Sequence, residues 1–578
     1  MKKAISVITI CLAVLSSYTA KAQGDNIKFG AYGRALQQTN RLDKKDTLNP
    51  DLTSQGHVLM DLGIKINPDK KTEIQSILRL KSDLGGFYGG SNIAELRQLF
   101  VKGIIGDFLS YQVGDIYLKM TPYTMYNSGS ELSISEATVF KDLRNDYVYY
   151  ENRNKGNSWW QQGAHTNFAI GTKSRYLEKI KFDGFFVRNR TADFFTQTPS
   201  TFHAGGRVMF VQSSRFNLGA NYLNLYDAGA THLSKFSTRN PVHSYETEVI
   251  VLDNDNLGLN INGELGFSQL NFVKDTMAPK HVNGNFWDAG VTAKVKPANL
   301  KVKLSYSYVS PRFYSSAAQT KRINYLNTPS IFPVYGNDPF NPINRNITAF
   351  DIVRDPTIYN VGITPLLMAY NPSYGNAQPY GKATPNRMGT TLDLNYTDSL
   401  QILSVDASGS YLKEVQGIDV TNKTRSFMIA SLAANLNINK LINFKKKILL
   451  HGGMKFEHTG RSGDSTLNIN LTNQIYDGGF EIEALKKLDL LVGIKAVNSK
   501  GSENVVIRDQ YNEIIGYNTT SFRNMNFQQL MLGYGAKYRF STATYITVQY
   551  HTFNLTDKSV PARTFNMNQF YILFNMNF

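Results

Sequence analysis

The sequence predicts an all-β protein: a single transmembrane antiparallel up-and-down β-barrel of about 22 strands, within a range of about 18 to 22. Three observations support this. Many segments alternate apolar and polar side chains, short and long connections follow each other in turn, and the chain ends on an aromatic strand. Because successive strand residues point to opposite faces, each segment has one apolar and one polar face. Such a wall can face lipid on one side and water on the other.

The composition excludes several other classes of protein. Of 578 residues, 42% are hydrophobic and 12% aromatic, which excludes a disordered chain. The single cysteine, Cys11, excludes a disulfide scaffold and any multi-cysteine metal site. A mean hydropathy of -0.30 argues against a bundle of membrane helices, but it is compatible with a barrel whose strands face water on one side.

The N-terminus predicts export. Residues 1–3 are a short basic start, residues 4–17 are mostly apolar, and Ala20-Lys21-Ala22 matches a small-x-small cleavage pattern. We therefore expect a signal peptide over 1–22 and a mature barrel over 23–578. A membrane anchor is the alternative, but the apolar stretch is shorter than the roughly 20 residues that span a bilayer. Loss of three lysines on cleavage lowers the net charge from +17 to +14.

The alternation identifies the individual strands. Clear apolar faces are Val58, Met60, Leu62, Ile64 and Ile66; Leu300, Val302, Leu304, Tyr306 and Tyr308; and Leu532, Tyr534, Ala536, Tyr538 and Phe540. The 22 expected starts are Ile27, His57, Glu73, Ile93, Leu109, His165, Ile180, His203, Phe216, Tyr245, Leu257, Phe286, Leu300, Met388, Gln401, Arg425, Lys447, Ile475, Leu488, Gln528, Thr544 and Phe565. Even counts are the rule for bacterial single-chain barrels.

The connections have two lengths. Short ones include 297–299, 397–399 and 486–487, and the long ones are 39–56, 120–160, 227–244, 310–387 and 498–526. Short turns at one rim and long loops at the other are typical of an outer-membrane barrel. A soluble β-sandwich also alternates, but nothing in that fold requires long and short connections to take turns.

The last strand resembles that of a known superfamily. Its alternating apolar residues are Phe570, Ile572, Phe574, Met576 and Phe578, the last of which ends the chain. In this the sequence resembles the Gram-negative outer-membrane β-barrel superfamily, in a porin-like, Bacteroidota-style form. The resemblance implies an integral outer-membrane location and a terminal strand that acts as the barrel-assembly signal. It also implies as partners outer-membrane lipid and lipopolysaccharide, periplasmic chaperones and the barrel-insertion machinery, with any solute or protein partner unknown. TonB-dependent transporters of similar size need an N-terminal plug domain, which we do not expect before the first strand.

Two long loops are candidates for filling the lumen. Loop 120–160 holds Ser133 and Glu136 in capping-box spacing before a predicted helix over 137–143, and by position it resembles a folded-in constriction loop. A helix lying outside the barrel is the alternative. Loop 310–387 carries ten of the 18 prolines together with many apolar residues. It predicts an ordered lid or an inward plug, with a surface loop as the alternative.

Basic residues near the short-turn rim predict the charge of the lumen. The candidates are Lys65, Lys181, Lys294, Lys301, Lys303, Lys537 and Arg539. Because rings of charge set selectivity in pores, a modest preference for anions follows. The alternative is that these residues pair with acids across strands. Aromatic residues expected at the membrane interfaces are Trp159, Trp160, Trp287, Tyr306, Tyr308, Tyr534 and Tyr538.

No catalytic or cofactor motif stands out, so neither an enzyme, a cofactor nor a metal is expected. His451, Glu457 and His458 lie close in sequence, and we interpret them as lumen or rim residues. Basic residues are spread over many strands, so nucleic acid is not expected as a partner. The predicted function is a porin-like channel or passive transporter for small solutes, with loops constricting the lumen. The alternative is a loop-plugged barrel that serves as a binding or scaffold component of a secretion or surface assembly, and an outer-membrane enzyme ranks third.

Overall fold

The fold is taken from a computed structural model of the whole chain. The structure describes residues 26–45, 49–84, 92–128, 135–151, 153, 155–192, 199–228, 236–274, 280–319, 375–417, 423–463, 468–508, 514–559, 561 and 564–578. The predicted signal peptide and cleavage site lie outside these residues.

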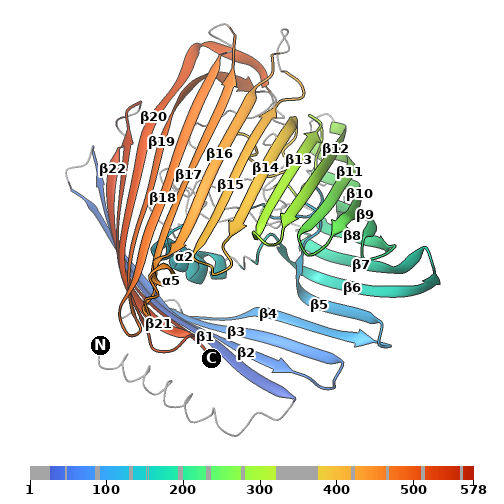
Figure 1. The fold of residues 1–578 in the computed structure, drawn as a ribbon, viewed down its shortest axis with the longest axis horizontal. Helices are drawn as coiled ribbons and strands as arrows, with labels where there is room; N and C mark the ends of the chain where they lie inside the picture. Colours follow the sequence, from blue (N-terminus) through green and yellow to red (C-terminus); the bar gives the residue numbers. More distant parts are fainter. Residues whose placement is uncertain are drawn as a thin grey trace.

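The chain forms a closed antiparallel ring of 22 strands. Each strand pairs with its neighbours in the sequence, and β22 (Phe565–Asn577) pairs with β1 (Ile27–Lys44) to close the ring. Figure 1 shows the strands running between two rims. Every expected start lies inside an observed strand or within two residues of one. The predicted barrel is therefore confirmed, at the upper end of the expected range of strands.

The remaining strand bounds complete the ring. They are β2 Asp51–Ile66, β3 Thr72–Asp83, β4 Asn92–Ile105, β5 Leu109–Leu118, β6 Trp159–Ser174, β7 Leu177–Arg190, β8 Ser200–Val211, β9 Phe216–Ala228, β10 Phe236–Asp253, β11 Leu257–Lys274, β12 Lys280–Val295, β13 Leu300–Val309, β14 Arg387–Thr397, β15 Leu403–Lys413, β16 Ser426–Asn437, β17 Ile448–Arg461, β18 Ile469–Leu485, β19 Leu488–Arg508, β20 Ile514–Arg539 and β21 Thr544–Asp557.

The two faces of the wall differ as the alternation predicts. On β13, Leu304 is 50% exposed, whereas the next residue, Ser305, is 6% exposed. On β19, Leu490, Val492 and Ile494 are all exposed. A large apolar surface on the outside of a closed sheet fits contact with lipid, because water would penalise so much exposed apolar area.

Several predicted long connections are shorter than expected. The observed gaps are 45–50 in place of 39–56, 229–235 in place of 227–244, and 509–513 in place of 498–526. The strands continue past the point where the alternation ends. Near the long-loop rim both faces of a strand can meet water, so side chains stop alternating while main-chain pairing persists.

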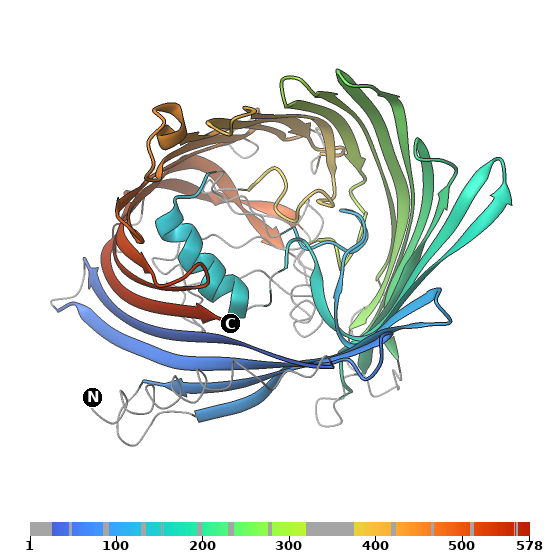
Figure 2. The same cartoon turned by 60° about the horizontal axis from the view of Figure 1, so that its bottom comes forward.

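Among the described residues the helices are few and short. They are α2 (Thr138–Leu143), the π-helix η1 (Arg144–Tyr149) and α5 (Ile438–Leu441). Figure 2 shows α2 inside the ring of strands, which favours the folded-in reading of loop 120–160. At this helix the N-cap is Ala137, with no side-chain hydrogen bond, and Glu136 pairs with Lys495. Ser133 of the predicted capping box lies outside the described residues. Within the described residues, no helix is long and apolar enough to cross a membrane.

Only the two ends of loop 310–387 belong to the described residues. Residues 310–319 and 375–386 are largely buried, and Phe313, Ser315 and Thr384 are all 0% exposed. Both ends therefore fold inward. Residues 320–374, which include most of the prolines, lie outside the described residues, so the predicted lid or plug stays a prediction.

Candidate functional site

A ladder of charged residues lines the inner face of the first four strands. Arg34 on β1, Asp61 on β2, Arg79 on β3 and Arg97 on β4 all point inward and are nearly inaccessible to solvent. Strand parity places them there, because their chain neighbours carry the outward apolar side chains. We call the inward-folded residues 135–151 the lumen helix.

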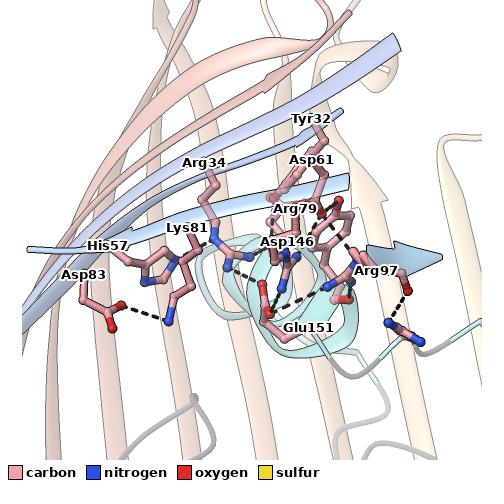
Figure 3. A network of polar contacts seen from close by, with 12 residues as sticks. Tyr32, Arg34, His57, Asp61, Arg79, Lys81, Asp83, Arg97, Asp146 and Glu151 are labelled. Carbon is pink, nitrogen blue, oxygen red and sulfur yellow. Dashed lines mark hydrogen bonds and ion pairs between the residues drawn. The ribbon is translucent and has the colours of Figure 1, made fainter. Parts of the chain in front are cut away.

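The lumen helix is clamped to this ladder through Glu151 (Figure 3). The Arg34 guanidinium contacts one Glu151 oxygen, and Arg79 Nη1 donates to the other at 2.6 Å. Arg79 also grips Asp61 with two parallel hydrogen bonds of 2.8 and 2.9 Å. Arg97 completes the cluster, with Nε 3.4 Å from Asp61 Oδ2. Bidentate arginine–carboxylate pairs of this kind are strong and fixed in geometry.

Aromatic rings of the lumen helix cover the same arginines. The Arg97 guanidinium lies 4.4 Å from the Tyr150 ring centroid, and Arg34 lies 4.7 Å from that of Tyr147. The Tyr150 hydroxyl donates to Asp61. Because cations over aromatic faces gain further attraction when shielded from water, these rings strengthen the clamp.

Two carboxyl groups of the lumen helix have oppositely shifted pKa values. Burial acts to raise the pKa of Glu151, but the charges of Arg34, Arg79 and Arg97 outweigh it and lower that pKa to about 2. Burial raises the pKa of Asp146 to about 6, and the nearby Asp142 adds to this. The charged form of Glu151 therefore stabilises the position of the helix, whereas the charged form of Asp146 destabilises it.

The opposite side of the lumen helix packs on glycines of β18–β20. A Cβ at Gly493 would lie 2.6 Å from Val139, and one at Gly533 would lie 2.6 Å from Phe140. Both apolar side chains are fully buried. Only glycine leaves room for so close an approach of helix and wall. We call Gly493 and Gly533 the glycine floor of the lumen helix.

Ion pairs surround this glycine floor. Lys495 and Arg144 both contact Glu136, and Lys537 Nζ lies 2.7 Å from Asp142. The Thr138 hydroxyl donates to Glu481 at 2.9 Å. The lumen helix is thus fixed to the ring on two sides, by β1–β4 and by β18–β20.

A second inner layer lies against the other strands. We call it the collar: residues 119–128, 310–319 and 375–386. Its segments bind one another through neutral hydrogen bonds, such as Ser315 Oγ to Thr124 O at 3.0 Å and Gln319 Nε2 to Ala383 O at 2.9 Å. Trp159 Nε1 of β6 donates to Ala317 O at 2.6 Å. Trp159 is 1% exposed, so its predicted place in an interfacial belt is wrong: it faces the lumen and holds the collar.

Among the described residues, adjoining cavities lie along β2–β13. The largest, about 790 Å³, is lined by the turn 67–71 and the neighbouring inner wall at the short-turn rim. It shares Asn167 with a cavity of about 490 Å³, which shares Arg207 and Met209 with one of about 250 Å³ beneath the collar. Charged side chains of both signs line the smallest one: Arg207, Glu246, Glu248, Glu264, Asp288, Lys303 and Lys382. Because neighbouring cavities share lining residues, they follow one another from the short-turn rim to the collar.

The basic residues predicted to line the lumen differ in their surroundings. Three of the seven candidates have acidic partners: Lys65 with Glu73 at 2.5 Å, Lys537 with Asp142, and Arg539 with Asp489 at 2.9 Å. Lys181 and Lys303 line the cavities, and Lys294 lies directly opposite Lys301 across the β12–β13 pair. The preference for anions stays a prediction.

Other predicted positions have definite places. Trp287 stacks on Tyr306 on the outer face, with ring centroids 5.1 Å apart, and both side chains are exposed. The terminal residue Phe578 exchanges main-chain hydrogen bonds with Ala31 and so helps to close the ring. His451 contacts Asn435, and His458 contacts Thr472. Among the described residues no group of three metal-binding side chains is present.

The architecture now identifies the type of barrel. Its strands form a closed up-and-down ring, its outer face is apolar, its lumen is polar, and one rim has short turns and the other long loops. The fold is that of an outer-membrane β-barrel.

Comparison with solved structures gives barrels of low sequence identity to this chain. No protein-family model and no curated protein matches the chain. Solved structures similar to it include the outer membrane protein OprD from Pseudomonas aeruginosa (8% identity, 97% of this chain and 95% of that chain, TM-score 0.35). OpdQ from Pseudomonas aeruginosa is 10% identical, over 95% of this chain and 98% of that chain, with a TM-score of 0.35. A BenF-like porin from Pseudomonas fluorescens is 9% identical, over 95% of this chain and 99% of that chain, with a TM-score of 0.33.

The sequence alone did not reveal the arginine ladder. Arg34, Arg79 and Arg97 lie on three separate strands, and their convergence depends on the register of β1–β4. Their signal was a charged residue at mid-strand depth on the polar face. Glu151 carried no such signal, because it lies in a long loop.

Proposed function

We propose that the protein is an outer-membrane channel for small solutes, constricted by the lumen helix and the collar. The observation that carries the proposal is the clamp of Arg34 and Arg79 on Glu151, which fixes a folded-in loop inside a closed polar lumen. A firmly fixed inner loop narrows a wide barrel without needing to move.

The cavities along β2–β13 support a passive route past the constriction. Both signs of charge line the smallest of these cavities, where Arg207 and Glu246 pair at 2.7 Å and Lys382 lies 4.0 Å from Asp288. Opposed charges orient the dipoles of hydrated polar molecules and oppose large apolar ones. We therefore infer transport of small polar solutes without an energy source.

Single-channel conductance of the folded protein in a planar bilayer tests the proposal. The intact barrel is expected to give a small, steady conductance. A Met209→Trp variant, which narrows the two inner cavities, is expected to lower it, while Met454→Trp on the outer face leaves it unchanged. Equal conductance for wild type and Met209→Trp would contradict the route.

The collar favours a second candidate function, a plugged binding or scaffold barrel. Its segments are interlocked by buried hydrogen bonds, and Arg387 holds one end through Ala377 O at 2.6 Å while lying 4.0 Å from the Phe427 ring centroid. A folded protein that never conducts, even without residues 320–374, would favour this candidate over a channel.

A further inference from the structure

One seam of the barrel wall is only partly paired. Strands β4 and β5 pair over six positions, from Ile105 opposite Leu109 to Phe100 opposite Gly114. A barrel strand needs about 9–11 residues to cross the hydrocarbon layer. The seam therefore opens within the membrane. Figure 1 shows β4 and β5 meeting at the short-turn rim and separating away from it.

Gly114 starts the separation. Its φ of +107° is a backbone conformation that favours glycine, and a side chain there would overlap the Leu99 carbonyl. Beyond it, β5 bends into the lumen, where Ile116 and Leu118 pack with Trp159 in a buried apolar cluster. The bend is built into the fold and leaves the edge of β4 without its strand partner.

Side chains replace the missing strand at the edge of β4. The Leu99 amide donates to Asp115 Oδ2 at 2.6 Å, and Arg153 donates to the Arg97 carbonyl. Unpaired main-chain groups at membrane depth are tolerated only where protein or a polar cavity satisfies them. Outside the edge lie Leu96 and Leu99, which are 55% and 44% exposed. The seam thus has an apolar mouth and a polar floor.

The polar floor of the seam contains buried hydrogen-bond donors that have no acceptor among the described residues. The Arg153 guanidinium lies 3.8 Å from the Trp160 ring centroid. Within the described part of the chain, Trp160 Nε1 and Arg153 Nη1 are buried and have no hydrogen-bond partner. Lys155 lies 5.2 Å from the ring centroid of Tyr117, which is directly opposite Trp160 across the β5–β6 pair. Two acids, Asp115 and Glu95, act on the charge of Arg153. Asp115 already accepts hydrogen bonds from the Leu99 amide and from Gln162 at 3.0 Å.

We propose that the β4–β5 seam is a lateral binding crevice for an amphipathic anion, whose charged head meets Arg153 and Trp160 while its apolar chain leaves past Leu96 and Leu99 toward the bilayer. A guanidinium matches the planar, two-oxygen head of a carboxylate and also binds phosphate. The indole N–H adds a donor that suits the same oxygens. This site lies in the wall and does not depend on conduction through the lumen.

Tryptophan fluorescence offers a direct test, because the chain has only Trp159, Trp160 and Trp287. A reporter carrying Trp159→Phe and Trp287→Phe keeps Trp160 alone. A matched control carrying Trp159→Phe and Trp160→Phe keeps Trp287, which is on the outer face. Both proteins are folded in nanodiscs and titrated with α-bromododecanoate. Its bromine is attached next to the carboxylate and quenches the fluorescence of a nearby tryptophan.

The crevice predicts saturable quenching of Trp160, with weaker and unsaturable quenching of Trp287. Adding Arg153→Gln to the Trp160 reporter should weaken binding about tenfold, the loss expected for one charge-assisted contact. Arg175→Gln in an exposed turn should leave binding unchanged. The uncharged methyl ester should fail to saturate. If Arg153→Gln does not fold, Arg153→Lys serves in its place. Lysine keeps the charge but lacks the paired N–H donors of the guanidinium, so this variant should bind with intermediate strength.

Two further results assign the source of the anion. Selective quenching of Trp160 by brominated phosphatidylglycerol in the nanodisc, competed by dodecanoate, would support a crevice that holds bilayer lipid. Quenching by the free acid alone would support a crevice for single-chain carboxylates. Equal quenching of Trp160 and Trp287, or equal binding of acid and ester, would overturn the inference. Displacement of the acid by inorganic phosphate alone would also overturn the inference, because the site would then recognise the negative charge without the apolar chain.

Discussion

The two bodies inside the barrel are held in different ways. The lumen helix depends on charges, since Arg34 and Arg79 clamp Glu151 on one side and Lys537 pairs with Asp142 on the other. The collar depends mainly on neutral hydrogen bonds such as the 2.6 Å contact of Trp159 Nε1 with Ala317 O. One barrel therefore contains an inner body held mainly by charge pairs and another held mainly by neutral hydrogen bonds.

This difference matters because charge pairs and neutral hydrogen bonds fail differently. Removing one partner of a buried ion pair leaves an uncompensated charge and costs about 3–5 kcal/mol. Losing a neutral hydrogen bond costs about 1 kcal/mol.

A spin label can report docking, by which we mean the binding of the lumen helix to the inner wall. Asn145→Cys places the label at an exposed position on this helix, and the only natural cysteine, Cys11, lies in the predicted signal peptide.

The largest effect is expected from filling the glycine floor. Gly533→Val places side-chain atoms where Phe140 now lies, and the Cβ alone would come within 2.6 Å of that ring. The lumen helix should detach, the spin label should become mobile, and single-channel conductance should rise several-fold. Gly452→Val is the matched control, because a Cβ there meets nothing within 4 Å. Equal behaviour of the two variants would show that the helix does not rest on this floor.

Breaking the clamp is expected to have the next largest effect. Glu151→Gln removes the carboxylate shared by Arg34 and Arg79 and should weaken docking by about 3 kcal/mol. Asp142→Asn, which breaks a more exposed pair with Lys537, should weaken it by about 1 kcal/mol or less. Spin-label mobility in the two variants measures the difference. A larger loss for Asp142→Asn would reverse the assigned order.

The two shifted carboxyl groups predict a smaller dependence on pH. Asp146 holds its proton up to about pH 6 when docked, against an ordinary pKa of 3.8, so docking should weaken as pH rises from about 4 to about 6. Glu151 has the opposite sign: its contribution is complete above its ordinary pKa of 4.5 and is lost as pH falls toward about 2. Label mobility should therefore be lowest near pH 4 to 5. Asp146→Asn should remove the rise on the neutral side, and a rise that persists in this variant would assign it to another group.

The smallest effect is expected in the collar. Trp159→Phe keeps the apolar packing but removes the hydrogen bond to Ala317 O, at a cost of about 1 kcal/mol. Heat denaturation should show this loss with no change between low and high salt. In contrast, Glu151→Gln should respond less to salt than the wild type, because its main charge pair is gone. A salt-sensitive Trp159→Phe variant would mean that charges also hold the collar.

The fold was predictable because one physical signal repeats in every strand. Even the strands at Ile93 and His165, whose apolar faces are interrupted by polar residues, were found from their period. Strand ends toward the long loops were not found, because alternation stops where both faces meet water. The inner structure was harder to predict. The clamp joins Arg34 to Glu151 across 117 positions, and no local pattern encodes a contact at that separation.

Single-channel conductance of a variant in which residues 129–151 are replaced by a short flexible linker tests the central claim most directly. The claim is that a fixed lumen helix constricts a conducting barrel. The account predicts a larger unit conductance than that of the intact protein, with weaker dependence on pH between about 4 and 6 because Asp146 is gone. Identical conductance in the two proteins would contradict it, because the lumen helix would then lie outside the conducting route.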